Sequence, residues 1–135
     1  MMKEQHFITE RMFDPDTPAL DISVLQEFAD TIGPSAPEML GQIVGLFLDE
    51  SPPLMAELAM SVRNANHARV VDIAHRLRGS CMSLGAYAMA DRCAILEECL
   101  PREAATLSLS VNVEYHRATD ALRAFLESGS KSQYP

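Results

Sequence analysis

The chain lacks tryptophan, has few aromatic residues (6%) and contains no long apolar run. A membrane span needs about 18 or more consecutive apolar residues, so none is expected. The first residues, MMKEQHFITERMFDPDTP, are mixed and polar and lack the apolar stretch of a secretory signal, which favours a cytoplasmic protein. Hydrophobic residues make up 47% of the 135 residues, mainly Leu, Ile, Val, Ala and Met. This composition is typical of one domain with a core of packed helices.

Cysteine is scarce, with three residues and no CxxC pair. An odd number without paired spacing suits neither a disulfide framework nor a zinc site. We therefore expect no metal site, and free thiols in a reducing compartment at Cys81, Cys93 and Cys99.

Basic residues are also few. Eleven Lys and Arg stand against 19 Asp and Glu, and the resulting net charge of −8 argues against a nucleic-acid partner. Between residues 63 and 78 the balance reverses, because Asp72 is the one acid there. A basic island in an acidic protein predicts a site for a local anion such as phosphate. The arginines of this island are Arg63, Arg69, Arg76 and Arg78.

Helical periodicity recurs along the chain, and no alternating strand pattern is present. The expected helices span about residues 22–31, 36–64, 67–85, 86–100 and 103–127. Amphipathic helices with short connections predict an all-α fold, an antiparallel up-down four-helix bundle with a short extra N-terminal helix. The bundle domain is expected at residues 19–128, between a flexible N-terminal tail at 1–18 and a C-terminal tail at 129–135.

Pro52 and Pro53 complicate the long second helix. They either break the chain near Glu50 or kink one continuous helix, and the kinked helix is favoured because the apolar spacing continues beyond them. The apolar residues expected to face the core in the first two helices are Ile22, Leu25, Phe28, Met39, Ile43, Leu46 and Phe47.

Residues that start and stop helices agree with these limits. Asp21 or Ser23 is expected to cap the first helix, and Asn66 the helix at 67–85. Gly85 is expected to end that helix, and Gly129 to stop the last one.

The helix at 67–85 places His75 on the side away from the core. At about 100° per residue an apolar stripe forms on one face, and His75 points roughly 150° from the middle of that stripe. The side chains around it are small or apolar, where a solvated face would normally carry Lys, Glu and Gln. The stripe consists of Val70, Ile73, Ala74, Leu77, Cys81 and Leu84, and the surroundings of His75 include Ala68, Val71, Gly79 and Met82.

This placement suits phosphoryl chemistry. Neutral imidazole is a competent nucleophile near pH 7, because its unperturbed pKa is about 6.5. His75 on a rigid helix can therefore attack a phosphoryl group presented by another protein. Gly79, one turn later, would let a bulky partner approach, at a cost of about 1 kcal/mol relative to alanine. Arg76 and Arg78 can offset charge on the transferred group.

Plainer alternatives stay open at this point. His75 could be a solvated surface residue, and Gly79 could serve close helix packing. The N-terminal segment, instead of a partner, could cover Val71 and Met82. The remaining histidines, which we expect to be solvated, are His6, His67 and His116.

The segment AHRLRGS at residues 74–80, followed by LGA at 84–86, resembles the signature of histidine-containing phosphotransfer (HPt) domains. That signature reads Ala-His-x-Leu-Lys-Gly-Ser with a later Leu-Gly-Ala. The resemblance extends over about residues 20–126 and implies a four-helix bundle whose His75 carries phosphate on Nε2. Arg78 stands where lysine is usual, which keeps the charge but not the ammonium geometry.

The resemblance implies a phosphorelay intermediate and not an enzyme. His75 would accept a phosphoryl group from a receiver-domain aspartate, or from a hybrid histidine kinase, and pass it to another response regulator. Mg²⁺ is expected in the partner receiver, with no cofactor of the chain's own. Arg76, Arg78 and Gly79 would support the transfer. The residues expected to contact the partner are Ala68, Val71, Asp72, Met82 and Ser83.

Two other functions can be compared with this one. A full histidine kinase is disfavoured, because the chain has no glycine-rich nucleotide loop and places Arg76 where kinases usually have an acid. A docking module that regulates a receiver or kinase without carrying phosphate remains the alternative. Such a module would be marked by a lost histidine or a blocked position 79, and neither is seen. We expect the protein to be a monomer.

Overall fold

The computed structural model describes residues 16–132, and side-chain exposure is described as far as residue 128. The helices are α2 (Ile22–Ile32), α3 (Ala36–Arg63), α4 (His67–Leu84), α5 (Tyr87–Glu98), the 3-10 turn η1 (Pro101–Glu103) and α6 (Ala104–Ser132). Residues 16–132 contain no β-strand. The structure confirms the predicted all-α fold.

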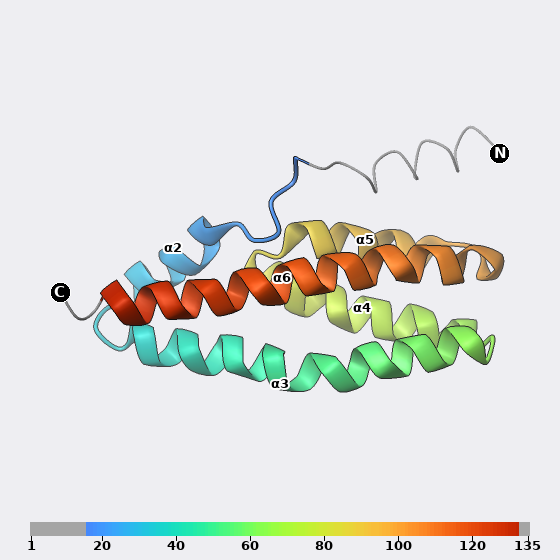
Figure 1. Cartoon of the computed structure of the whole chain (residues 1–135), viewed down its shortest axis with the longest axis horizontal. Coiled ribbons are helices and arrows are strands. Elements are labelled where there is room, and N and C mark those ends of the chain that lie inside the picture. The colour runs from blue at the N-terminus through green and yellow to red at the C-terminus, as the bar shows by residue number, and fades with distance from the viewer. Residues whose placement is uncertain (1–15, 133–135) are drawn as a thin grey trace.

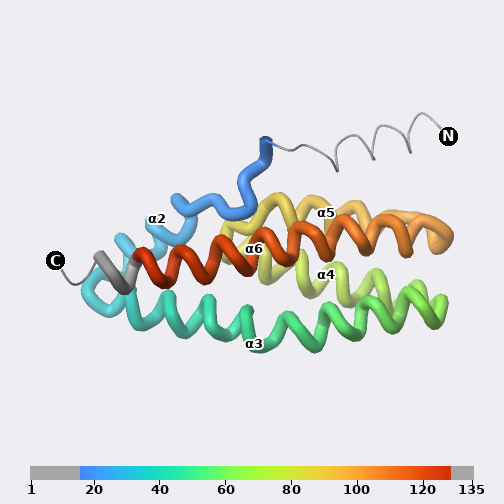
Figure 2. Tube along the Cα trace, viewed as in Figure 1, coloured from blue at the N-terminus to red at the C-terminus, as the bar shows by residue number. Residues whose placement is uncertain are grey.

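The helices form an antiparallel four-helix bundle with α2 as a short addition. Figure 1 shows α3 and α6 running the length of the molecule, with α4 and α5 beside one half of them and α2 beside the other half. The Cα trace in Figure 2 shows the same division. In sequence order each of the four long helices packs against the next, and α6 closes the bundle against α3.

Local sequence fixes the helix ends much as expected. The Asp21 side chain accepts a hydrogen bond from the Ser23 N–H at 3.1 Å, and the Asn66 side chain accepts one from the Arg69 N–H at 3.2 Å. Gly85 ends α4 with a left-handed φ of 83°, a conformation that glycine adopts without a steric penalty. Both predicted N-caps and the predicted stop at Gly85 are confirmed.

Helix α3 continues through its two prolines. Pro52 and Pro53 lie inside the helix, and Figure 1 shows α3 changing direction near its middle. Each proline lacks the N–H that would bond the preceding turn, and its ring crowds the carbonyl four residues earlier. Beside them, the buried Ser51 hydroxyl lies 2.9 Å from the Tyr115 hydroxyl of α6. The interpretation as one kinked helix is confirmed.

The predicted inward face of α2 is largely wrong. Leu25 is buried, but Ile22 and Phe28 are 46% and 36% exposed. Helix α2 packs mainly against one helix, α3, at the end of the bundle. Only a narrow row of its side chains is therefore covered. Helical periodicity identifies an apolar side, but the neighbours decide how much of that side is covered.

The predicted stripe in the first half of α3 is also displaced. Phe47 is buried as predicted, but Met39, Ile43 and Leu46 are exposed. The positions buried in place of Met39 and Ile43 are Leu40 and Val44, each one residue later. Both sets share the same helical spacing, so periodicity alone does not distinguish them. Since α4 and α5 run beside the other half of α3, this half lacks the two helices that could cover the wider stripe.

The C-terminal end differs from expectation as well. Helix α6 continues to Ser132, so the predicted stop at Gly129 is wrong. A glycine inside a helix costs only about 1 kcal/mol relative to alanine, which a long helix can absorb. Residues 1–15 and 133–135 lie outside the described residues, and the limits of the two tails therefore stay a prediction. No helix within the described part of the chain is long and apolar enough to cross a bilayer.

Candidate functional site

Helix α4 presents His75 to solvent, as its sequence predicts. All six residues of the predicted stripe are buried. The His75 side chain, on the opposite side, is 66% exposed. The prediction that His75 is not a core histidine is confirmed.

One ring nitrogen of His75 is engaged by α5. Nδ1 lies 2.8 Å from Oε1 of Glu97, whose side chain is only 15% exposed. An ionised carboxylate can only accept a hydrogen bond, so this contact requires the proton to be on Nδ1. Nε2 then carries the free lone pair, and no described residue forms a hydrogen bond with it. The exposed imidazole is held in one tautomer with Nε2 available.

Arg78 completes this arrangement from the next turn of α4. Its Nε donates to Oε2 of Glu97, and its Nη2 lies 3.4 Å from Oε1. The same Nη2 lies 3.3 Å from Nδ1 of His75, a longer contact than that between Nδ1 and the carboxylate. Arg78 therefore lies on the Nδ1 side of the ring and fixes the orientation of Glu97.

The charges of this cluster act on the Glu97 carboxyl group. Its partial burial favours the neutral form, but the hydrogen bonds from Arg78 and His75 and the charge of Arg78 outweigh that effect and lower the pKa of Glu97. The carboxylate in turn raises the pKa of Arg78. Both groups are ionised at neutral pH, which keeps the hydrogen bond to Nδ1 charge-assisted.

The predicted basic island is partly neutralised by carboxylates, and the anion site expected there stays a prediction. Arg69 donates through Nε to Glu57 of α3 at 2.8 Å and through Nη1 to Asp72 at 2.6 Å. Arg78 is paired with Glu97, as described above. Two of the four arginines are thus each paired with a carboxylate from another helix, Glu57 or Glu97, which a count of charges along α4 misses. Arg76 has no ion-pair partner among residues 16–128.

Gly79 lies open on the same face. A Cβ built on Gly79 would meet no atom within 4 Å. Close helix packing among the described residues therefore does not account for this glycine, which contradicts the packing alternative raised by the sequence. By contrast, a Cβ at Gly85 would lie 2.7 Å from the backbone oxygen of Asp21.

The predicted docking residues mostly lie at the surface of α4. Val71 is half-buried, and Met82 is 51% exposed. The remaining three, Ala68, Asp72 and Ser83, are exposed. None of the described residues buries Met82, and the N-terminal segment that was the alternative cover lies mainly outside the described residues.

The three cysteines are free thiols, as expected. Burial raises the pKa of Cys81 to about 12 and the pKa of Cys93 well above its ordinary value. Buried thiols of this kind are poor nucleophiles. No group of His, Cys, Asp and Glu suited to a metal ion occurs in the described part of the chain.

One of the other histidines does not behave as predicted. His67 is half-buried, and its Nε2 lies 3.1 Å from the backbone oxygen of Cys99, whereas we expected a solvated ring. The reason is tertiary: the start of α4 lies beside the end of α5. His116 is exposed as expected, and His6 lies outside the described residues.

Sequence reasoning missed Glu97 as a site residue. It lies 22 positions after His75 and on another helix. A signal was present, because His75 and Glu97 lie at similar distances on either side of the turn at Gly85. Residues so placed come side by side when two consecutive helices pack antiparallel. An acid at that position was therefore a candidate partner for the histidine.

Comparison with known proteins adds to this geometry. The family model described as the Hpt domain matches residues 42–128, which is more than half of the chain. The chain belongs to the Hpt domain family. The match covers most of α3, all of α4 and α5, and α6 as far as residue 128. It leaves α2 and the segment before it outside.

A curated relative of this Hpt domain is the sensor protein TorS of Escherichia coli (strain K12), with 31% identity over 97 residues. The aligned region is 68% of this chain but only 10% of TorS, so the chain spans about a tenth of that relative. No solved structure matches the chain at a significant level.

Membership of the family establishes a broad role. Hpt domains are phosphotransfer carriers of two-component phosphorelays, and their family partners are receiver domains and kinases. The chain therefore has a phosphorelay role in two-component signalling.

Proposed function

We propose that this Hpt domain is a phosphorelay intermediate that carries a phosphoryl group on Nε2 of His75. It accepts the group from the aspartate of a receiver domain or hybrid histidine kinase and passes it to another response regulator. The observation that supports this most is the exposed imidazole of His75, with Nδ1 held by Glu97 and Nε2 free.

The proposed transfer uses the lone pair on Nε2. As the N–P bond forms, the bond between phosphorus and the aspartyl oxygen breaks, and the aspartate leaves as a carboxylate. The proton stays on Nδ1, so the ring gains positive charge. Transfer to the next receiver reverses these changes, with an aspartate oxygen displacing the ring nitrogen. The chain needs no base to remove a proton from the attacking atom.

Glu97 supports this chemistry in two ways. It keeps the proton on Nδ1, which leaves the nucleophilic lone pair on Nε2. It also places a carboxylate 2.8 Å from the nitrogen whose positive charge grows during attack. A charge fixed in advance lowers the barrier because it costs no reorganisation during the reaction. Arg78 holds the carboxylate in place, a role beside the offsetting of phosphoryl charge that the sequence predicts for it.

The surface around His75 suits the approach of a folded partner. Gly79 leaves open space one turn away, and Met82 offers an exposed apolar side chain. Val71, Ala68, Asp72 and Ser83 are proposed to contact the partner as well. Mg²⁺, which assists phosphoryl transfer by neutralising charge, would belong to the receiver and not to this chain.

The experiment that tests the proposal is phosphotransfer from a receiver domain charged with acetyl phosphate. Wild type is compared with His75→Gln and with His116→Gln, which removes an exposed histidine of α6 and serves as the matched control. Wild type and His116→Gln are expected to acquire acid-labile, base-stable phosphate, and His75→Gln none. Circular dichroism checks that all three proteins have the same helical content.

Label on His75→Gln would overturn the assignment of the acceptor. Binding to receivers without any transfer to wild type would overturn the carrier function and favour a docking module that carries no phosphate.

A further inference from the structure

Residues 16–21 connect two parts of the bundle before the chain enters α2. We call this segment the strap. At one end, the backbone oxygen of Thr17 accepts a hydrogen bond from Nη2 of Arg117 on α6 at 3.3 Å. Leu20, in the middle, is 7% exposed and belongs to the core. At the other end, the Asp21 N–H donates to the backbone oxygen of Gly85 at 2.8 Å. The strap thus joins the middle of α6 to the end of α4.

A buried carboxylate holds the arginine to which the strap is attached. Nη1 of Arg117 donates to both oxygens of Glu114, at 2.7 and 2.9 Å. Glu114 is only 3% exposed, and Nη2 of the buried Arg92 lies 3.6 Å from it across the α5–α6 contact. Both bonds come from Nη1, which ties this nitrogen to a buried carboxylate and leaves Nη2 to donate to Thr17.

The other end of the strap fits closely against the C-cap of α4. The backbone oxygen of Asp21 approaches Gly85 so closely that a Cβ there would lie 2.7 Å from it. Gly85 closes the last turn of α4, the turn that also carries Met82 and Ser83. His75 lies roughly three turns earlier, about 15 Å away along the helix axis. The strap therefore supports the docking end of α4 and not the histidine itself.

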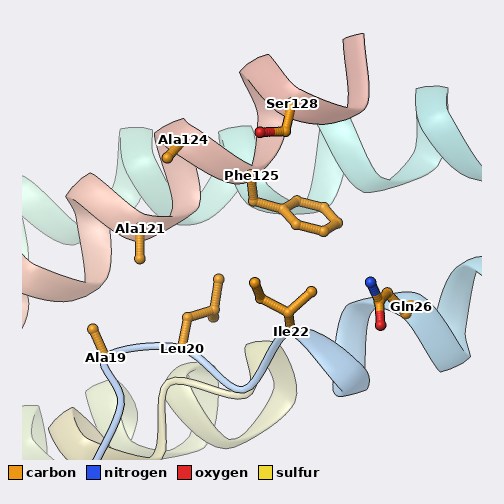
Figure 3. A pocket seen from close by; sticks show the side chains of 8 residues that line it. All are labelled: Ala19, Leu20, Ile22, Gln26, Ala121, Ala124, Phe125 and Ser128. Atoms are coloured by element: carbon orange, nitrogen blue, oxygen red, sulfur yellow. The ribbon is translucent and has the colours of Figure 1, made fainter. Parts of the chain in front are cut away.

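Beside the strap there is space for it to move. A cavity of about 620 Å³ separates the start of α2 from the last part of α6. Figure 3 shows Leu20 and Ile22 on one side of this cavity and Ala121 and Phe125 on the other. Ala19 and Leu20 of the strap line this cavity, so this part of the strap is not packed continuously against α6. Residues 16–19 of the strap are not buried, and such a segment opens locally at lower cost than the core around it.

We propose that the strap is a conformational device that controls the docking end of α4. When the strap is attached, the last turn of α4 is ordered and presents Met82 and Ser83 for docking. When it is released, this turn frays and docking weakens, while the chemistry at His75 and Glu97 is unchanged. The proposal deepens the proposed phosphorelay function and rests on it for the docking step. The attachment of the strap to α4 does not depend on that function.

Hydrogen exchange of the whole chain tests the attachment without any partner. Arg117→Gln removes the bond to Thr17, and Arg123→Gln is the matched control, because Arg123 lies on the same helix and its side chain is 59% exposed. The double variant Glu114→Gln with Arg117→Gln avoids a buried unpaired carboxylate if the single variant folds poorly. We expect the amides of Asp21 and Ala86 to exchange at least tenfold faster, and the amide of Ile73 in mid-α4 to be unchanged. Unchanged exchange at Asp21 and Ala86 in a folded variant would overturn the proposal.

Transfer kinetics then test the effect on docking. With a phosphorylated receiver as the varied substrate, the strap variants are expected to raise KM at least threefold and to leave kcat within twofold of the Arg123→Gln control. A lower kcat with an unchanged KM would overturn the link between strap and docking, and so would unchanged kinetics in a variant whose Asp21 amide has lost protection. Absence of transfer to wild type would overturn the proposed function instead, and the exchange result would still stand.

Discussion

Nδ1 of His75 lies 2.8 Å from Oε1 of Glu97, although 22 residues separate the two in sequence. The contact joins α4 to α5 at the exposed edge of their packed faces. It decides which nitrogen of the imidazole carries the proton, and therefore which nitrogen is free to react. Arg78 bonds to the same carboxylate and completes a cluster of three side chains.

Replacing Glu97 by alanine should change the tautomer of His75. Without the carboxylate, Nη2 of Arg78, 3.3 Å from Nδ1, becomes the available partner and donates to Nδ1. The proton then moves to Nε2 and blocks the nucleophile. We expect phosphotransfer to slow by roughly tenfold or more, as for the loss of one charge-assisted hydrogen bond. Ring ¹⁵N chemical shifts of His75 report the tautomer directly.

Glu98→Ala is the control for this change, because Glu98 is the exposed neighbour of Glu97 and forms no hydrogen bond with His75. Wild-type shifts and rates are expected for it. A Glu97→Ala protein that keeps the proton on Nδ1 would contradict the assigned role of the carboxylate.

The lowered pKa of Glu97 predicts a specific acid sensitivity. A carboxyl group whose pKa is lower in the folded state contributes stability that is present above its unfolded pKa, near 4.5, and is lost as the pH falls through the folded value. The difference in unfolding free energy between wild type and Glu97→Gln should therefore be constant above about pH 5 and shrink below pH 4.5. Urea unfolding at a series of pH values measures it.

Glu98→Gln, examined over the same pH range, shows how much of the change comes from any exposed carboxylate. If the wild-type and Glu97→Gln curves stay parallel below pH 4.5, the stabilising contacts of Glu97 are not those described.

Arg78→Ala should impair transfer more than stability. The Arg78 side chain is 38% exposed, so its pair with Glu97 is partly screened by water and contributes little to folding. Its loss, however, frees the carboxylate that orients His75. We expect single-turnover transfer to slow several-fold, with a midpoint of thermal unfolding close to that of wild type. Arg76→Ala is the comparison, because Arg76 is adjacent and has no ion-pair partner among residues 16–128. Equal slowing in both variants would indicate a general effect of positive charge.

Gly79 within α4 and Gly85 at its C-cap should respond in opposite ways to replacement by alanine. Gly79→Ala is expected to stabilise the protein by about 1 kcal/mol, since the position is helical and its Cβ meets nothing within 4 Å. Gly85→Ala is expected to destabilise it by about 1 kcal/mol or more, because φ is 83° and the Cβ would clash with Asp21. Chemical denaturation measures both changes.

A larger side chain at position 79 separates packing from docking. Gly79→Leu should fold normally, because the space is open, yet transfer from a receiver should be slow, because the leucine would occupy the approach to His75. Transfer at the wild-type rate would show that the partner does not approach over this residue.

In α4, the sequence by itself determined what depends on local periodicity and capping. In α4, the spacing of apolar residues defined the buried stripe, and Asn66 and Gly85 defined the ends. The exposure of His75 followed, because a side chain on the helix face opposite the buried stripe is directed away from the core. The four-helix bundle and the resemblance carried by residues 74–86 also followed from the linear chain.

The tertiary structure alone decided which groups meet across helices. Glu97 reaches His75, Glu57 reaches Arg69 and Arg117 reaches Thr17 because separate segments of the chain pack side by side. In the first half of α3, two sets of apolar positions have the same helical spacing, so periodicity does not show which set is buried. The packing of neighbouring helices makes Val44 buried and leaves Ile43 exposed. The physical reason is the same in each case. A helix fixes the directions of its own side chains, but its neighbours determine what lies in those directions.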